Sequence, residues 1–305
     1  MLPVVDGGPL WDFDLESTVV RSVERGLVLV RTDREGDTGA VLDAARGGLV
    51  RLPARPGWTV WPMALSWGGD LVVTQMSRGG SRGVMVLYSL ATAAQRTCAV
   101  PGGWTHNAAL SPNGRMLATT DLESDCGAAG VTLTDVDDGT QRQLWTGQGA
   151  PTALGWSPDG RHLAVSCEVD DGFSCDTTVI DVATGAAAAQ FPGFVVLSSP
   201  NGCWIEKGAV VLLPFDDDSP GNFAVADVDH GSVRQYAPRP PEWAGGCHAI
   251  IGGRLIQSFW DKGLYSTALD GSNPRQLLSV AAGRAVTVAD VAPNASSTRF
   301  ESDQV

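Results

Sequence analysis

The sequence has very little lysine and no long apolar run. Lys207 and Lys262 are its two lysines, and its 34 acidic residues outnumber its 21 basic residues to give a net charge of -13. Because such a chain repels phosphate groups and anionic lipid, we expect neither nucleic acid nor an anionic membrane as a partner. No stretch reaches the ~18 apolar residues that a membrane-spanning helix needs, so we expect no transmembrane segment.

The sequence also lacks the marks of an export signal and of a zinc ribbon. Its first residues, MLPVVDGGPLWDF, do not contain the basic region and the apolar region of a signal peptide. We therefore expect either a cytoplasmic protein or an extracellular or cell-envelope protein whose leader has been removed. None of the six cysteines forms a Cys-x-x-Cys pair, which argues against a zinc ribbon.

Hydrophobic residues, glycine and proline are abundant. Hydrophobic residues make up 43% of the 305, so a sizeable core can be buried. The 37 glycines and 18 prolines are spread along the whole chain and indicate many turns. Because all-β folds of this length often form one domain, we expect a single domain over residues 1–305, present as a monomer.

Two segments repeat closely, AALSPNGRMLATTD at 108–121 and LGWSPDGRHLAVSC at 154–167. Each predicts a strand, a tight turn and a second strand, because Asn-Gly and Asp-Gly supply the positive φ of tight hairpins. Five weaker copies keep the turns 42 to 48 residues apart; the fifth turn is placed at 206–208, because the Ser-Pro-Asn-Gly of 199–202 would break the period. The turn residues of the seven copies are Gly26, Gly69, Gly114, Gly160, Gly208, Gly253 and Ala295.

Each copy is followed by a polar loop and two further strands, as in VTLTDVDDG and then QRQLW. Four strands in about 45 residues are typical of a propeller blade, so the sequence predicts an all-β propeller of seven four-stranded blades. The last repeat is short unless it continues into the N-terminus. We therefore expect the two termini to share the seventh blade, which would leave no free sheet edges. Six blades with an extra C-terminal hairpin are the alternative.

The motifs SPNGR at 111–115 and SPDGR at 157–161 resemble the repeat of TolB-type propellers, within the wider WD-repeat-like class. The resemblance covers nearly the whole chain and implies a propeller whose loops bind something. It implies no reaction, because propellers host receptors, scaffolds, lyases and hydrolases alike. The Trp-Asp and Gly-His pairs of true WD repeats are absent at the expected places.

In a propeller, the loops between blades and those between second and third strands share one face, where the central channel opens. Several of these loops are acidic, above all DDDSPG at 216–221. Carboxylate oxygens suit calcium or magnesium, so Asp216, Asp217 and Asp218 are the candidate metal ligands. The alternative is that aspartate simply favours turns, since no loop has the spacing of a calcium-binding loop.

Tryptophans form a second pattern on this face, near the start of innermost strands. Ringed around a channel mouth, they would stack on a sugar, an aromatic ring or a cationic ligand. Packing between blades is the alternative. The candidates for ligand binding are Trp58, Trp61, Trp104, Trp204 and Trp243.

Cysteine and histidine form a third pattern. The segments GCWIEKG and GCHAIIGG place Cys203 and Cys247 one repeat apart, on adjacent inner strands. A disulfide, a soft metal site with His248 and a nucleophilic Cys-His pair all remain open, and we favour the disulfide over free buried thiols. His106 also begins an inner strand, so His106 and His248 are the candidate catalytic residues.

Two further disulfides are predicted. Cys167 and Cys175 flank the loop of one hairpin, and Cys98 and Cys126 lie near each other in consecutive blades. Three bridges would place the protein outside the reducing cytosol.

Three functions fit these patterns. The first is a non-catalytic, secreted or envelope propeller that binds a protein, peptide, glycan or small cationic or aromatic ligand on its acidic, Trp-rich face. The alternative is a metal-assisted lyase or hydrolase at the channel entrance, with calcium or magnesium as its cofactor. The third is an intracellular assembly scaffold.

Overall fold

The computed structural model consists of strands and turns, with no helix in the part of the chain that it describes. Within that part, no helix is long and apolar enough to cross a membrane. The described residues are 18–24, 27–32, 38–43, 48–53, 56–67, 69–78, 83–98, 107–121, 128–169, 174–196, 203–206, 208–215, 223–236, 247–251, 254–259, 263–268 and 272–278.

The strands form six antiparallel sheets in chain order, and we call these sheets blades 1 to 6. Blades 1 to 3 consist of β1 (Thr18–Glu24), β2 (Leu27–Thr32), β3 (Thr38–Asp43) and β4 (Gly48–Arg51); β5 (Thr59–Leu65), β6 (Leu71–Ser77), β7 (Val84–Ser89) and β8 (Gln95–Cys98); and β9 (Ala108–Leu110), β10 (Met116–Asp121), β11 (Ala128–Asp135) and β12 (Gln141–Gln148).

Blade 4 has four strands, and the described residues of blades 5 and 6 give five and four. These blades consist of β13 (Ala150–Trp156), β14 (His162–Val169), β15 (Ser174–Asp181) and β16 (Ala187–Pro192); β17 (Phe194–Val196), β18 (Trp204–Glu206), β19 (Ala209–Pro214), β20 (Phe223–Asp227) and β21 (Ser232–Tyr236); and β22 (Cys247–Ile251), β23 (Arg254–Phe259), β24 (Gly263–Ala268) and β25 (Arg275–Leu278).

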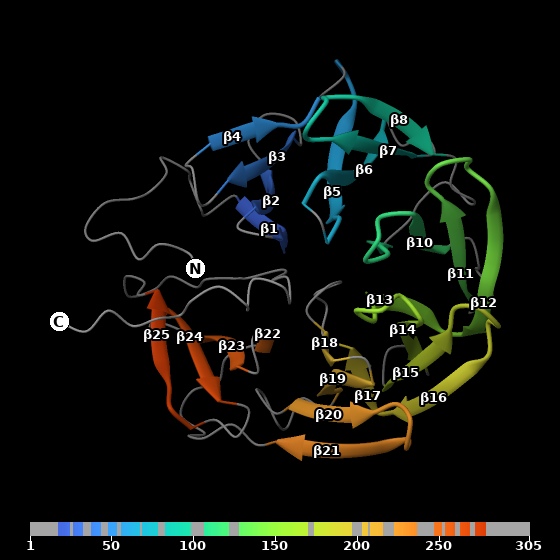
Figure 1. Ribbon diagram of the computed structural model, residues 1–305, viewed down its shortest axis with the longest axis vertical. Helices are drawn as coiled ribbons and strands as arrows, with labels where there is room; N and C mark the ends of the chain where they lie inside the picture. The colour runs from blue at the N-terminus through green and yellow to red at the C-terminus, as the bar shows by residue number, and fades with distance from the viewer. Residues whose placement is uncertain are drawn as a thin grey trace.

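Figure 1 shows the six blades arranged around a central axis, with β1, β5, β13, β18 and β22 near it. Consecutive blades contact one another through these inner strands, as β5 contacts β9 and β13 contacts β17. The all-β propeller and its four-strand repeat are therefore confirmed. The predicted seventh blade falls on residues 279–305 and 1–17, which lie outside the described residues, so the number of blades stays a prediction.

The tight turns of the repeat are where the sequence predicts them. Gly69, Gly114 and Gly160 have φ angles of 69°, 71° and 70°, the left-handed conformation that glycine adopts without strain. In blade 5, β18 pairs with β19 through Trp204 and Val210, so the turn lies next to Gly208 as the period requires. The inner strand of this blade is split, because β17 pairs with the other end of β19.

The hydrophobic core is divided among the junctions between blades. Strands in the middle of a blade are buried on both faces, so β6 has six consecutive buried residues, whereas the outer strand β12 is mostly exposed. One apolar cluster joins blades 3 and 4 around Trp156, and another joins blades 4 and 5 around Trp204 and Phe223. Stacking therefore buries what a single blade would leave exposed.

Candidate functional site

The order of strands places the connections of each blade alternately on two faces of the ring. The turn face carries the connections from first to second strand and from third to fourth. The loop face carries those from second to third strand and those between blades. Turn-face connections have two to six residues, whereas loop-face connections range from one residue, at Gly149 or Gly193, to the ten residues 237–246.

The turn face is built from repeated hydrogen-bonded turns. Ser111 Oγ donates to Asn113 Oδ1 over 2.8 Å and accepts from the backbone N–H of Met116 over 2.9 Å. In blade 4, Ser157 makes the same bonds to Asp159 and His162, both over 2.8 Å. The Ser-Pro-Asn/Asp-Gly-Arg motif therefore forms a turn whose polar groups are hydrogen-bonded within the turn itself.

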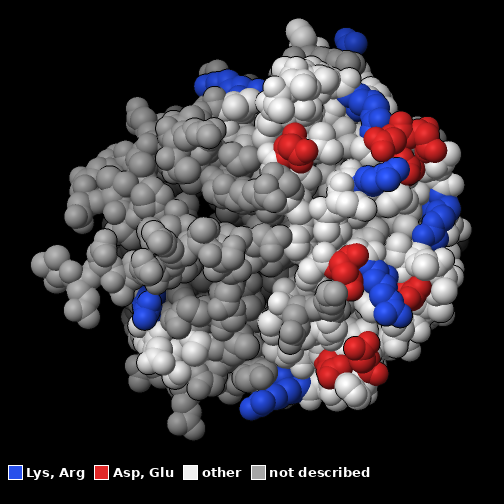
Figure 2. All heavy atoms as spheres, viewed as in Figure 1, with Lys and Arg blue, Asp and Glu red and all other residues white. Residues whose placement is uncertain are grey.

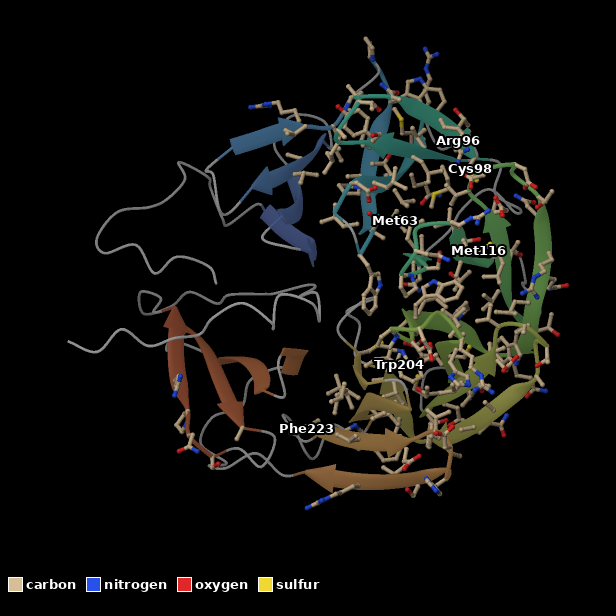
Figure 3. All side chains as sticks on the ribbon, in the orientation of Figure 1. Met63, Arg96, Cys98, Met116, Trp204 and Phe223 are labelled. Atoms are coloured by element: carbon tan, nitrogen blue, oxygen red, sulfur yellow. The ribbon has the colours of Figure 1, made fainter. Side chains whose placement is uncertain are left out.

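Arginines on the turn face connect neighbouring blades. Arg96, labelled on β8 in Figure 3, donates from Nη1 to the backbone carbonyl of Asp137 in blade 3 over 3.0 Å. Arg142 of blade 3 donates to the backbone carbonyl of Val182 in blade 4. Figure 2 shows acidic and basic side chains lying beside one another over the described half of the ring. Arg96 and Arg142 thus connect blade 2 to blade 3 and blade 3 to blade 4.

On the loop face, polar side chains connect the inner strands of blades 3 and 4. The backbone N–H of Asn107 donates to Thr120 Oγ1 over 3.2 Å, and the N–H of Thr120 donates back to the Asn107 carbonyl over 3.1 Å. Asn107 Nδ2 then donates to the carbonyl of Pro151 over 3.2 Å. The start of β13 is thereby held by a residue of the preceding blade.

A second hydroxyl network connects blades 4 and 5. Ser166 Oγ lies 2.7 Å from Thr177 Oγ1 and accepts from the backbone N–H of Val196 over 2.7 Å. Thr177 Oγ1 donates to the carbonyl of Phe194 over 2.8 Å. Because Ser166 and Thr177 are fully buried, these bonds form away from water and hold β17 rigidly against blade 4. Asp176 extends the network by accepting from the Gly193 N–H over 3.0 Å.

Sequence reasoning missed this network, although the repeat contains a signal for it. Thr120 and Ser166 occupy the same position of the two best-matched repeats, one residue before the end of each quoted segment. The buried hydroxyl at this position accepts a backbone N–H in both repeats, from Asn107 of the same blade for Thr120 and from Val196 of the next blade for Ser166. Hydrogen bonds from Asn107, Ser166 and Thr177 therefore hold the inner strands in place at the loop face of blades 3 to 5. We call this part of the loop face the rim.

Trp204 is not on an open surface, which corrects its prediction as a ligand-binding residue. The side chain is fully buried, and its Nε1 donates to the carbonyl of Gly155 in blade 4 over 3.1 Å. The ring of His162 stacks on it, with centroids 6.2 Å apart and 12° between the planes. Figure 3 labels Trp204 on the inner strand of blade 5. Trp204 therefore packs blades together, the alternative named for it above.

Trp58 and Trp61 lie at the loop-face end of blade 2. Both are half-buried, and Trp58 packs against the cluster of Val60, Met76 and Val86. Both side chains are partly exposed, and their binding role stays a prediction. Trp104 and Trp243 lie outside the described residues.

The predicted disulfide between Cys167 and Cys175 is wrong. Cys167 lies opposite Asp176 and Cys175 opposite Glu168, so the two cysteines are offset by one residue. Successive residues of a strand point to opposite faces, so the thiols point apart, and both are free and buried. Burial raises the pKa of Cys167 to about 12 and also raises the pKa of Cys175.

The other two predicted bridges differ in their outcome. Cys98 has a free, buried thiol, which contradicts a bridge to Cys126, itself outside the described residues. Cys203 is buried between blades 4 and 5, and the side chain of Cys247 lies outside the described part, so that pairing stays a prediction. The free thiols remove the disulfide argument for an extracellular or envelope location.

The inner strands contain β-bulges. Register shifts leave one unpaired residue in five of them, which are Arg21 in β1, Met63 in β5, Thr152 in β13, Ile205 in β18 and His248 in β22. A bulge changes the direction of a side chain and is common beside functional sites. His248, a candidate catalytic residue, is therefore the unpaired residue of a β-bulge. Its catalytic role stays a prediction, and His106 lies outside the described residues.

The metal candidates Asp216, Asp217 and Asp218 also lie outside the described residues. Among the residues that are described, no three His, Cys, Asp or Glu side chains come together as a metal site would require. Calcium or magnesium binding stays a prediction for these three aspartates.

Comparison with known proteins shows the fold. No family model and no curated protein matches the chain. Its fold is similar to that of TolB from Acinetobacter baumannii, with a TM-score of 0.55 at 16% identity over 72% of this chain and 53% of that one. A β-propeller domain from Myceliophteria thermophila is similar with a TM-score of 0.58 at 12% identity, over 86% of this chain and 87% of that domain.

A chain from a study of two prolyl endopeptidases is also similar, with a TM-score of 0.64 at 14% identity over 90% of this chain and 45% of that one. The present chain thus spans about half the length of the TolB and endopeptidase chains. These similarities confirm the resemblance to TolB-type and WD-repeat-like propellers at the level of the fold.

Proposed function

We propose that this chain is a non-catalytic binding propeller that holds a protein or peptide partner on its loop face. The difference between the two faces carries the proposal. Turn-face connections are short, with two to six residues, and the same hydrogen-bonded serine turn recurs in blades 3 and 4, whereas loop-face connections vary from one residue to ten. Variable loops on a rigid scaffold are the usual arrangement of a recognition surface.

The rigidity of the rim supports the same function. Asn107, Ser166 and Thr177 hold the starts of β13 and β17 through buried or half-buried hydrogen bonds. A rim that is already ordered loses little conformational entropy when a partner binds, so more of the contact energy appears as affinity. Trp58 and Trp61 add half-buried indole surface at blade 2, the residue type most often found in binding hot spots.

A peptide library displayed on phage and selected against the full chain provides the test. We expect synthetic copies of the selected peptides to bind at least tenfold more weakly to the loop-face variants Trp58→Ala or Glu168→Ala. Binding to the turn-face variants Asp137→Ala and Asp229→Ala should stay within twofold of the unaltered protein. Peptides whose binding is weakened only by the turn-face substitutions would overturn the proposal. Unchanged melting temperatures verify that every variant is folded.

We also infer that the two terminal segments complete the ring as a seventh blade. The 27 residues after β25 and the 17 before β1 make 44, which is one repeat. Deletion of residues 1–17 should then expose residues 279–305 to protease, as followed by mass spectrometry. Equal protection of the C-terminal segment with and without residues 1–17 would contradict a shared blade.

A further inference from the structure

The turns between third and fourth strands have the same backbone in blades 3 and 4, so they can be compared residue by residue. The first aspartate of each turn, Asp135 or Asp181, donates its backbone N–H to a carbonyl five residues later. A glycine four residues after that aspartate has a φ angle of 75° in blade 3 and 74° in blade 4. The position two residues after the aspartate holds Asp137 in blade 3 and Ala183 in blade 4.

In blade 3, two arginines lie near the carboxylate of Asp137, one at each oxygen. Arg96 comes from the preceding blade, and its Nη1 lies 3.0 Å from the backbone carbonyl and 4.0 Å from Oδ1 of Asp137. Arg115 comes from the same blade, and its Nε lies 3.6 Å from Oδ2. The carboxylate therefore lies between two guanidinium groups and offsets part of their charge.

Blade 4 has the same two arginines without that carboxylate. Arg142 comes from the preceding blade and donates to the backbone carbonyl of Val182. Arg161 comes from the same blade, and its backbone carbonyl accepts from the N–H of Val182 over 2.9 Å. Both arginines are therefore anchored on the residue next to Ala183. Among the described residues, no carboxylate forms an ion pair with Arg142.

The aspartates already present at this turn do not replace the missing group. Asp181 Oδ1 accepts from the N–H and the hydroxyl of Thr184, each over 3.0 Å, and Oδ2 lies 3.6 Å from Arg161 Nε. Asp135, at the same position of blade 3, likewise accepts two N–H groups of its own turn. Asp159 accepts from the backbone N–H of Arg161 over 3.1 Å. The bridging carboxylate is thus the difference between the two turns.

We propose that Arg142 and Arg161 bind a carboxylate from another molecule, an aspartate or glutamate side chain of a partner, where blade 3 has Asp137. Both arginines and Ala183 are exposed, so a ligand reaches this position from solvent. A guanidinium group has several N–H donors, and the bond to Val182 uses one of those of Arg142, so donors remain for a carboxylate. The position is on the turn face and does not depend on the function proposed for the loop face.

Blade 3 favours a carboxylate over a phosphate as the ligand. There the chain itself presents a planar group with one oxygen toward each arginine. The protein carries a net charge of -13, and Asp159 and Asp181 lie in the adjoining turns. These charges repel a doubly charged anion more strongly than a singly charged one.

NMR titration of the arginine Nε–Hε signals with N-acetylaspartate amide, at constant ionic strength, tests this. We expect the Arg142 and Arg161 signals to shift together along one binding curve. The neutral N-acetylasparagine amide should cause shifts at least tenfold smaller. The Arg96 and Arg115 signals should shift at least fivefold less than those of blade 4, because Asp137 already lies between them.

Two reciprocal substitutions sharpen the test. Ala183→Asp supplies the missing carboxylate from the chain itself, so binding of N-acetylaspartate amide at blade 4 should weaken at least tenfold while the melting temperature stays equal or rises. Asp137→Ala should make the Arg96 and Arg115 signals shift as those of blade 4 do. The matched control is Gln190→Glu, which adds a carboxylate at an exposed residue of β16 and should change the binding less than twofold.

Several results would overturn the proposal. These are equal losses in Ala183→Asp and Gln190→Glu, equal shifts at blades 3 and 4 of the unaltered protein, and unresponsive blade 3 signals in Asp137→Ala. Tighter binding of inorganic phosphate than of N-acetylaspartate amide would assign the position to phosphate instead. If no arginine signal shifts, this inference falls and the function proposed for the loop face stands.

Discussion

The indole nitrogen of Trp204 donates a hydrogen bond of 3.1 Å to the carbonyl oxygen of Gly155 in the preceding blade. One repeat earlier, Trp156 makes the same bond, also of 3.1 Å, to the carbonyl of Ala109. The inner strands of blades 3, 4 and 5 are thus connected by two equivalent tryptophans. A residue type that resembled a ligand-binding ring in the sequence is used here to set the spacing between blades.

Gly155 is expected to tolerate no side chain. A Cβ atom there would lie 2.1 Å from Sγ of Cys203 and 3.7 Å from Nε1 of Trp204. Gly155→Ala should lower the free energy of unfolding by about 1–3 kcal/mol, as overpacked cores do. Urea unfolding measures the loss. The penalty should shrink when Cys203→Ala removes the sulfur, and strictly additive effects of the two substitutions would contradict this account.

Ser166→Ala should destabilise the contact between blades 4 and 5. It leaves the backbone N–H of Val196 without its acceptor in a buried position, at a cost of about 1–3 kcal/mol. Thr146→Ala, which alters an exposed residue of β12, is the control and should stay within about 0.5 kcal/mol of the unaltered protein. Similar losses for the two variants in urea unfolding would argue against the hydroxyl network.

Cys167 should make the protein less stable in alkali. Burial raises the pKa of its thiol from 9.0 to about 12, so above pH 9 the unfolded chain loses a proton that the folded protein keeps. This group's contribution is then complete below pH 9 and is lost as the pH rises toward 12, at up to about 1.4 kcal/mol per pH unit. The difference in unfolding free energy between the unaltered protein and Cys167→Ala should therefore change between pH 8 and 10.5. A difference in unfolding free energy that stays constant over this pH range would refute the raised pKa of Cys167.

Thiol titration tests the correction to the disulfides. In the folded protein at neutral pH, Cys98, Cys167 and Cys175 should react slowly with an aromatic disulfide reagent, because burial raises the pKa of each thiol. After unfolding without a reductant, all three should react at once. A Cys167–Cys175 bridge detected by peptide mapping of the unreduced protein would show instead that the register found here is not that of the protein.

His230 should titrate above its ordinary range. Its Nδ1 lies 2.9 Å from Asp227 Oδ2, and this hydrogen bond raises the pKa of His230 and lowers that of Asp227. The pair stabilises the turn after β20 between the lowered pKa of Asp227 and the raised pKa of His230, and its contribution is lost as the pH rises through the pKa of the imidazole or falls through that of the carboxyl group. NMR titration should show the His230 pKa fall in Asp227→Asn. A titration curve that is the same in both proteins would disprove the coupling.

Much of the fold was predictable because the repeat is local. The Ser-Pro-Asn-Gly-Arg and Ser-Pro-Asp-Gly-Arg turns satisfy their own polar groups within five residues, so their sequence specifies their shape wherever they occur. Regular spacing of such turns then predicts the blades. The turn next to Gly208 was placed correctly by the period alone, against a more obvious motif nearby.

The candidate site was less predictable, because it depends on contacts between blades. The sequence cannot say whether a tryptophan at the start of an inner strand points between two sheets or toward solvent, so Trp58 and Trp204 look alike until their neighbours are known. The error at Cys167 and Cys175 has a similar origin. Their separation along the chain suits a hairpin bridge, and a register offset of one residue places the thiols on opposite faces.

The sequence by itself determined the all-β architecture and the period of the blades, because strand alternation and turn chemistry are properties of short segments. Only the tertiary structure decided that Trp204 is internal and that Ser166 and Thr177 hold the next inner strand. Those relationships arise when sheets 40 to 50 residues apart in the chain are packed against each other, and packing depends on which side chains meet.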